Sequence, residues 1–221
     1  MRGAATQQRG KKELMGSRYY GFLSVAFVAG VAAPANAQLI LSPHLDASVA
    51  GDVETSRGGA GASVGYYLPA WRGLGIGLEL DASWHGHFFR DEDVSSLVPE
   101  GVDLNTDALL LMGQLVLPVS IPRAPIWRPY GTFGLGVIHA LFTVPGNTEY
   151  DTDQDNLTLS AGVGMMHQLT RLLGLRADVR YYHAFVDEHA SHGGYFEDYG
   201  FWAVSVGVTL QLPPQRWPDL W

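Results

Sequence analysis

The sequence predicts an all-β protein, an eight-stranded antiparallel up-and-down transmembrane β-barrel. About eight stretches after residue 37 alternate apolar residues with small or polar ones, which is the period of a two-faced strand. The connections between them alternate between short and long, a pattern typical of membrane barrels. No later stretch holds about 18 consecutive apolar residues. A closed barrel is then the remaining way to cross a bilayer with every backbone group hydrogen-bonded.

The first 37 residues are interpreted as a signal peptide. A basic segment precedes an apolar core at residues 20–33, and Ala35-Asn36-Ala37 fits a small-residue cleavage site. We expect cleavage after Ala37, so that the exported chain begins at Gln38. The sequence has no cysteine, which excludes a lipoprotein anchor at this point and any disulfide.

The rest of the chain is strongly acidic. Five of the 14 basic residues and one of the 22 acidic residues lie in the leader, which leaves nine against 21 and a net charge of −12. Both lysines of the chain belong to the leader. A nucleic-acid binder needs a cationic surface, and soluble β-proteins commonly guard exposed strands with lysine. The composition therefore argues against both classes and predicts no nucleic-acid partner.

Strands are expected, in order, near residues 39–50, 57–68, 74–88, 106–119, 128–142, 156–169, 173–186 and 199–212. Each reaches the 9–11 residues that a tilted strand needs to cross a membrane. The linkers at 69–73, 121–127 and 170–172 are short and poor in charge, whereas those at 89–105, 144–155 and 187–198 are longer and acidic. The barrel domain is thus expected to cover 38–212, with 213–221 as a short periplasmic tail.

The two faces of the strands differ in composition. On the third strand Leu78 and Leu80 are placed outward, and on the last strand the outward positions run Trp202, Val204, Val206, Val208, Leu210, Leu212. The inward positions are rich in glycine and polar residues, which suits a crowded lumen. A soluble barrel would show the same alternation with its faces exchanged. The strand ends carry outward aromatic residues, which are Tyr66 and Trp127 on one rim and Trp84, Phe88, Tyr181 and Trp202 on the other. Such positions suit the interfacial girdles of a membrane barrel.

The segments Gly174-Leu-Arg-Ala-Asp-Val-Arg-Tyr-Tyr182 and Ser205-Val-Gly-Val-Thr-Leu-Gln-Leu212 resemble the last two strands of the OmpA-like outer-membrane β-barrel superfamily. Arg128-Pro-Tyr-Gly-Thr-Phe-Gly-Leu-Gly136 resembles its fifth strand. The resemblance covers essentially the whole chain after the leader. It implies a bacterial outer-membrane location, a monomer, and outer-membrane lipids and lipopolysaccharide as partners. It implies no single activity, because that superfamily is functionally mixed.

The last strand is also similar to the signal that the barrel-assembly machinery recognises, with Ser205 and Gly207 followed by Leu210 and Leu212. In the family the strand usually ends on an aromatic residue, and here Leu212 stands in its place. The assembly machinery is therefore expected as a second kind of partner.

Charged residues also fall on the inner face of two strands. Glu79 and Asp81 lie two apart on the third strand, and Arg176, Asp178 and Arg180 lie two apart on the seventh. These strands stand opposite each other in an eight-stranded barrel, so ion pairs across the lumen are expected. A barrel of this size is only wide enough for side chains to fill. The charges are interpreted as a lumen ion-pair network that plugs the barrel, with a narrow ion or proton path as the alternative.

The acidic linkers invite comparison with metal sites. Glu149, Asp151, Asp153 and Asp155 have spacings similar to a calcium loop, but Asn156 and Gly162 stand where an EF-hand needs glycine and glutamate. These four residues are weak candidates for a loose divalent-cation site. The histidines offer only pairs, whereas metal sites need three or four ligands. His85 and His87 are expected to share the inner face near the outer rim, and His189 and His192 lie in the last long linker. No metal centre and no cofactor are expected.

An enzymatic alternative stays open. His189-Ala-Ser191 resembles the His-x-Ser pairing of the lipid A deacylases, with Glu197 as the residue that would orient the histidine. That family has asparagine where this chain has His192. The sequence favours a non-enzymatic outer-membrane barrel with an envelope-structural or surface-interaction role through acidic extracellular loops. A lipid A deacylase-like esterase and a narrow small-molecule or ion conduit are the alternatives.

Overall fold

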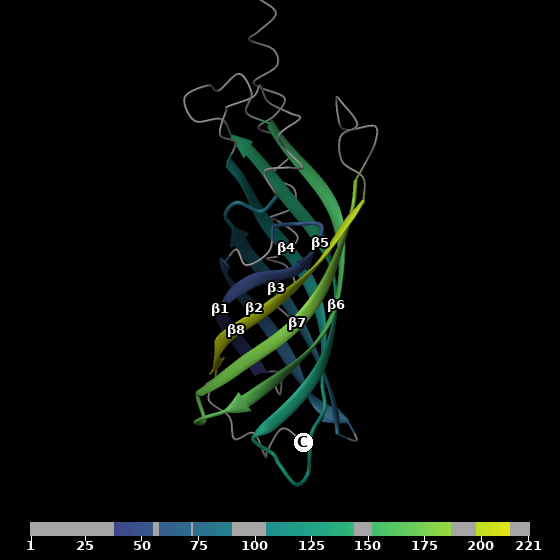
Figure 1. The fold of residues 1–221 in the computed structure, drawn as a ribbon. Coiled ribbons are helices and arrows are strands. Elements are labelled where there is room, and N and C mark those ends of the chain that lie inside the picture. The colour runs from purple at the N-terminus through teal and green to yellow at the C-terminus, as the bar shows by residue number, and fades with distance from the viewer. Residues whose placement is uncertain are drawn as a thin grey trace, which may run out of the picture. The chain divides into compact units, whose positions relative to one another are not determined.

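The computed structural model describes residues 38–54, 58–71, 73–89, 105–143, 152–186 and 198–212. They form one closed barrel of eight antiparallel strands in sequence order (Figure 1). The strands are β1 (Gln38–Gly51), β2 (Gly58–Trp71), β3 (Leu74–His85), β4 (Asn105–Pro118), β5 (Trp127–Thr143), β6 (Thr152–Gln168), β7 (Leu173–Phe185) and β8 (Tyr199–Leu212). The predicted fold class is confirmed. The expected signal peptide and the tail at 213–221 lie outside the described residues and stay predictions.

The first and last strands close the barrel. Leu39 on β1 pairs with Leu212 on β8, and the ladder continues to Gly51 and Phe201 with one register shift between Ser48 and Ala50. Every described strand therefore has a hydrogen-bonded neighbour on both sides, which removes the free edges that an open sheet would present. No helix in the described ranges is long and apolar enough to span a bilayer.

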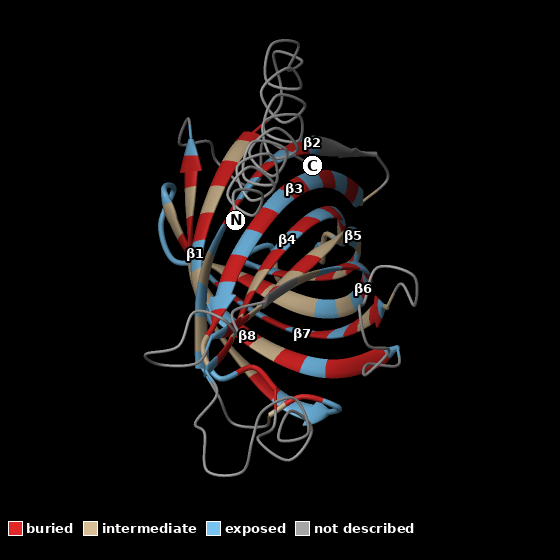
Figure 2. Cartoon of the chain, turned by 90° about the horizontal axis from the view of Figure 1, so that it is seen from above, coloured by how far each residue is buried: buried red, intermediate tan, exposed pale blue. Residues whose placement is uncertain are grey.

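Burial alternates residue by residue along the strands (Figure 2). On β3 the pattern is strict, with Glu79 and Asp81 buried and Leu78 and Leu80 exposed. The alternation follows from the strand geometry, because successive side chains point to opposite faces. The face assignment made from the sequence agrees with these exposures on β3 and on β8, where Ser205 is buried and Val206 is exposed.

The end of β3 differs from the expectation. The strand stops at His85 rather than near residue 88, and His87 has a φ of 52°, which breaks the alternation. As a result Phe88 is buried in the barrel (1% exposed) and does not join the outer aromatic rim, so that prediction was wrong. The expectation that His85 and His87 share the inner face was also wrong, because His85 is buried and His87 is exposed.

The sixth strand begins earlier than expected. It starts at Thr152 instead of near 156, because its ladder with β5 continues outward to the pair of Phe142 and Thr152. The hairpin of β5 and β6 is therefore the longest in the barrel, with 17 residues in each strand. Asp153 and Asp155, which the sequence placed in a loop, belong to this hairpin.

The lumen is filled in layers along the barrel axis. An apolar cluster rich in aromatic residues fills the half near the long connections, and we call it the aromatic layer; it includes Val53, Phe88, Phe89, Leu110, Ile138, Phe142, Tyr182, Tyr199 and Phe201. A smaller cluster of Ile40, Tyr67, Val116, Tyr130 and Met166 lies toward the short turns. The predicted charged residues lie between these two clusters along β3 and β7.

Candidate functional site

The middle of the lumen holds the five charged residues singled out from the sequence, and we call this group with its neighbours the charged layer. Glu79 and Asp81 come from β3, and Arg176, Asp178 and Arg180 come from β7. Each lies at an inward position of its strand and is 3–5% exposed. The period of two along each strand places them on one face, and closure of the barrel brings the two strands opposite each other.

Arg176 is the centre of the first half of the charged layer. Its Nη1 donates to Glu79 Oε1 across the lumen at 2.6 Å, and its Nε donates to the Tyr130 hydroxyl at 2.8 Å. Tyr130 in turn donates to Asp178 Oδ2 at 2.6 Å, and Tyr67 donates to Glu79 Oε1. Charge-assisted hydrogen bonds of this kind are among the stronger ones in proteins.

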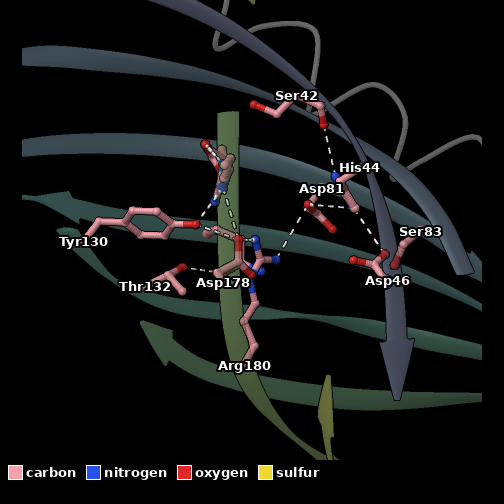
Figure 3. Close-up of polar contacts among 12 residues, drawn as sticks. Ser42, His44, Asp46, Asp81, Ser83, Tyr130, Thr132, Asp178 and Arg180 are labelled. Atoms are coloured by element: carbon pink, nitrogen blue, oxygen red, sulfur yellow. Dashed lines mark hydrogen bonds and ion pairs between the residues drawn. The ribbon is translucent and has the colours of Figure 1, made fainter. Parts of the chain in front are cut away.

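Arg180 is the centre of the second half. Its Nε lies 2.7 Å from Asp178 Oδ1, and its Nη1 lies 3.7 Å from Asp81 Oδ2. Figure 3 shows the layer continuing from Asp81 to His44 and Asp46 of β1. The His44 Nε2 atom is 3.8 Å from Asp81 Oδ2 and 3.3 Å from Asp46 Oδ2. The charged layer thus reaches from β7 through β3 to β1.

Four members of this layer were missed in the sequence, namely His44, Asp46, Tyr67 and Tyr130. All four lie at inward positions of their strands, so the alternation itself was the signal. Tyr67 lies an even number of positions from the inward glycines of β2, and Tyr130 lies two positions from the buried Thr132, so each is on the inward face of its strand. The alternation gives the face of a residue but not its partner across the lumen.

Inward glycines make room for these side chains. A Cβ atom at Gly65 would lie 2.5 Å from Glu79 Cγ, and one at Gly77 would lie 2.7 Å from the Tyr67 ring. A Cβ at Gly164 would meet the Tyr130 ring and hydroxyl. The glycine-rich inner face and the bulky charged residues are therefore two parts of one packing arrangement.

The energetics of the charged layer follow from its burial. Ions removed from water lose several kcal/mol of hydration each, and mutual pairing offsets that loss only where the geometry is good. Here each guanidinium faces two carboxylates: Arg176 faces Glu79 and Asp178, and Arg180 faces Asp178 and Asp81. Removal of one member would leave a buried charge without its partner, which is costly. The ion pairs of the charged layer therefore link β3 to β7 across the lumen.

The aromatic layer covers the charged layer on the side of the long connections. The segment after His87 turns back into the barrel: the Phe88 N–H donates to Thr106 O at 2.5 Å, and the Glu54 N–H donates to Phe88 O at 2.9 Å. The Phe88 ring meets Phe201 edge to face with centroids 5.1 Å apart. The Phe89 ring stacks on Phe142 at 5.5 Å. Apolar rings thus fill this half of the lumen.

One arrangement in the lumen superficially resembles a catalytic triad. Ser83 Oγ lies 3.4 Å from His85 Nε2, and Asp46 Oδ2 lies 3.9 Å from the same nitrogen. A triad needs the carboxylate on one ring nitrogen and the hydroxyl on the other. Both partners here face Nε2, and the group is buried next to Phe88, whose ring lies 5.9 Å from the His85 ring. The geometry does not support nucleophilic catalysis at Ser83.

The other predicted site residues are not brought together. His189, Ser191 and Glu197 lie outside the described residues, as do Glu149 and Asp151. Asp153 pairs with Leu141 in the ladder of β5 and β6, and Asp155 Oδ1 lies 2.6 Å from His139 Nδ1. In the part of the chain that the structure covers, no group of three or more His, Asp or Glu side chains is arranged to hold a metal ion.

The assembly-signal residues lie on β8. Ser205 and Gly207 occupy inward positions, in register with Asp46 and His44 of β1. Leu210 and Leu212 occupy outward positions near the short turns. Recognition by the assembly machinery stays a prediction.

An apolar outer face around a filled, charged lumen defines the class of small membrane-spanning β-barrels. Residues 22–211 match the model of the outer membrane protein beta-barrel domain family, and the chain belongs to this family. The family implies a location in the bacterial outer membrane, and the resemblance drawn from the sequence is confirmed. No curated protein matches the sequence with significance.

The solved structures that share the fold include the following three. Neisserial surface protein A is 14% identical with a TM-score of 0.52, over 79% of this chain and 97% of that chain. Ail, the attachment invasion locus protein of Yersinia pestis, solved in complex with the heparin analogue sucrose octasulfate, is 14% identical with a TM-score of 0.51, over 80% and 98%. A major outer membrane protein of Thermus thermophilus is 14% identical with a TM-score of 0.52, over 79% and 99%. These identities show a common fold alone.

Proposed function

We propose that this protein is a non-conducting, non-enzymatic outer-membrane barrel that acts through its surface, in envelope structure or in contacts made by its acidic loops. The observation that carries the proposal is the charged layer. Five buried acidic and basic side chains from β3 and β7 pair within and across the lumen, where a conduit would need an open aqueous path. The aromatic layer lies over them on the side of the long connections.

The charge distribution supports a surface role. The four connections on the long side, at residues 52–57, 86–104, 144–151 and 186–198, hold 13 acidic and two basic residues. In bacterial outer-membrane barrels the longer connections face the outside of the cell. Such a face favours cationic partners and disfavours polyanionic ones, because charge complementarity steers encounter and like charges repel.

The first experiment is conductance in planar bilayers. We expect no discrete current steps from the purified barrel, because the lumen is filled by paired charges and apolar rings. Regular steps would overturn the non-conducting part of the proposal and favour the narrow conduit. Retention of the heat-modifiable band on gels is the control that the inserted protein is folded.

The second experiment tests the enzymatic alternative. Mass spectrometry of lipid A from cells that overproduce the protein is expected to show unchanged acylation, with the same spectrum for a Ser191→Ala variant. Loss of an acyl chain that Ser191→Ala abolishes would establish the esterase and contradict the proposal. A deletion strain with increased sensitivity to detergents, or with reduced adhesion, would identify which surface role the barrel has.

A further inference from the structure

The short-turn end of the barrel carries a second exposed surface. The segment at residues 119–126 joins β4 to β5, and the segment at 169–172 joins β6 to β7. The Gln168 N–H donates to Ile126 O at 2.9 Å, and the Trp127 ring lies over the His167 ring with centroids 4.1 Å apart. The two turns therefore lie side by side and form one surface, which we call the turn rim.

The turn rim exposes apolar side chains. Val119, Ile126, Leu169 and Leu172 are 42–49% exposed, although they lie at or beyond the strand ends. Trp127 is exposed beside them. Clustered exposed apolar residues mark a surface that meets another apolar phase. Their place next to the outer face of the barrel puts them at the boundary between hydrocarbon and headgroups, where tryptophan is enriched.

The turn rim is also cationic. Arg123 and Arg171 are exposed, one in each turn, and neither turn contains an aspartate or glutamate. The ion pairs found among the described residues include neither arginine. The connections at the opposite end hold 13 acidic and two basic residues, so the connections at the two ends of the barrel have opposite charge.

We propose that the turn rim binds anionic phospholipid headgroups of the inner leaflet of the outer membrane. A guanidinium presents a planar fork of donors that matches a phosphate, and its aliphatic stem can lie along acyl chains. The four aliphatic side chains enter the acyl boundary while the two arginines reach the phosphates, as in interfacial anchors. Short turns of outer-membrane barrels face the periplasm, which places the rim at the phospholipid leaflet.

The test uses the full barrel purified in detergent and equimolar phosphatidylglycerol and phosphatidylcholine, with retained lipids measured by native mass spectrometry. We expect preferential retention of phosphatidylglycerol. An arginine near a lipid surface favours anionic lipids by about fivefold, so Arg123→Gln and Arg171→Gln should each lower the ratio of the two lipids by about that factor. The double variant should approach parity.

The matched controls are Arg57→Gln and Arg90→Gln, which remove the same charge from the long connections. They should leave the phosphatidylglycerol preference unchanged. The heat-modifiable band must persist in every variant, so that loss of fold is recognised. An unchanged lipid ratio in the folded double variant would overturn the proposal, and so would an equal loss in the controls. None of these outcomes depends on whether the barrel conducts ions or acts on lipid A.

Discussion

The charged layer and the aromatic layer fill neighbouring parts of one lumen by different chemistry. In the charged layer each side chain has specific partners at specific atoms, as Arg176 has with Glu79 and Tyr130. In the aromatic layer, residues such as Phe88 and Ile138 are held by shape and apolar contact. The first layer therefore depends on the identity of its residues, whereas the second depends mainly on their volume.

The two layers also contribute differently to the stability of the barrel. Paired charges at the centre couple β3 to β7 and oppose slippage of the barrel, because a shift by one residue would turn every charge toward lipid. The aromatic layer shields the charged layer from water on the side of the long connections. The lower local dielectric strengthens the pairing of the charges. The two layers support each other, and their mutational responses should differ.

The largest effect is expected for Arg176→Met in the charged layer. The change leaves Glu79 buried without its cation and takes one of two cations from Asp178, so the free energy of unfolding should fall by about 3–5 kcal/mol. Urea titration of the barrel in detergent micelles measures it. Adding Glu79→Gln to the same chain should recover part of the loss, because the stranded charge is removed. Additive losses in the double variant would show that the two residues are not coupled.

An intermediate effect is expected for Gly164→Ala. The new methyl group would meet the Tyr130 ring, which its bonds to Asp178 and Arg176 hold in place, so overpacking should cost about 1–3 kcal/mol. Gly131→Ala on β5 is the matched control, since nothing lies within 4 Å of its added Cβ and its stability should change little. The same urea titration compares the two. Equal effects would contradict the packing described for Tyr130.

The smallest effect is expected for Ile138→Val in the aromatic layer. Loss of one buried methylene from a site that is 0% exposed should lower the free energy of unfolding by about 0.5–1.5 kcal/mol. The comparison with Arg176→Met in one titration series sharpens the contrast between the layers. A larger loss of unfolding free energy for Ile138→Val than for Arg176→Met would contradict the difference described between the two layers.

Much of the charged layer could be anticipated because strands have a period of two. That period put Glu79 and Asp81 on one face and Arg176, Asp178 and Arg180 on another, and an eight-stranded closure put the two strands opposite each other. The period does not give the position of a residue along the barrel axis relative to residues on other strands. His44, Asp46, Tyr67 and Tyr130 were therefore missed, although each has the inward parity.

The errors arose where the alternation stopped. His87 has a left-handed backbone that ends the alternation of β3, and Phe88 lies inside the barrel instead of on the outer rim. A positive φ is uncommon for any residue other than glycine, so an uninterrupted strand was the default expectation at His87. The extension of β6 to Thr152 was missed for a different reason, since its hydrogen bonds are supplied by β5. The position where β6 begins therefore depends on its partner strand β5.

By itself, the sequence determined the number of strands, the face of nearly every residue and the membrane as the surrounding phase, because these depend on local alternation and on which face is apolar. The tertiary structure decided which charges meet, how the segment at Phe88 turns into the barrel, and that Arg123 and Arg171 share one rim. Those features depend on closure and register, which bring together residues far apart in the chain through contacts that no local pattern encodes.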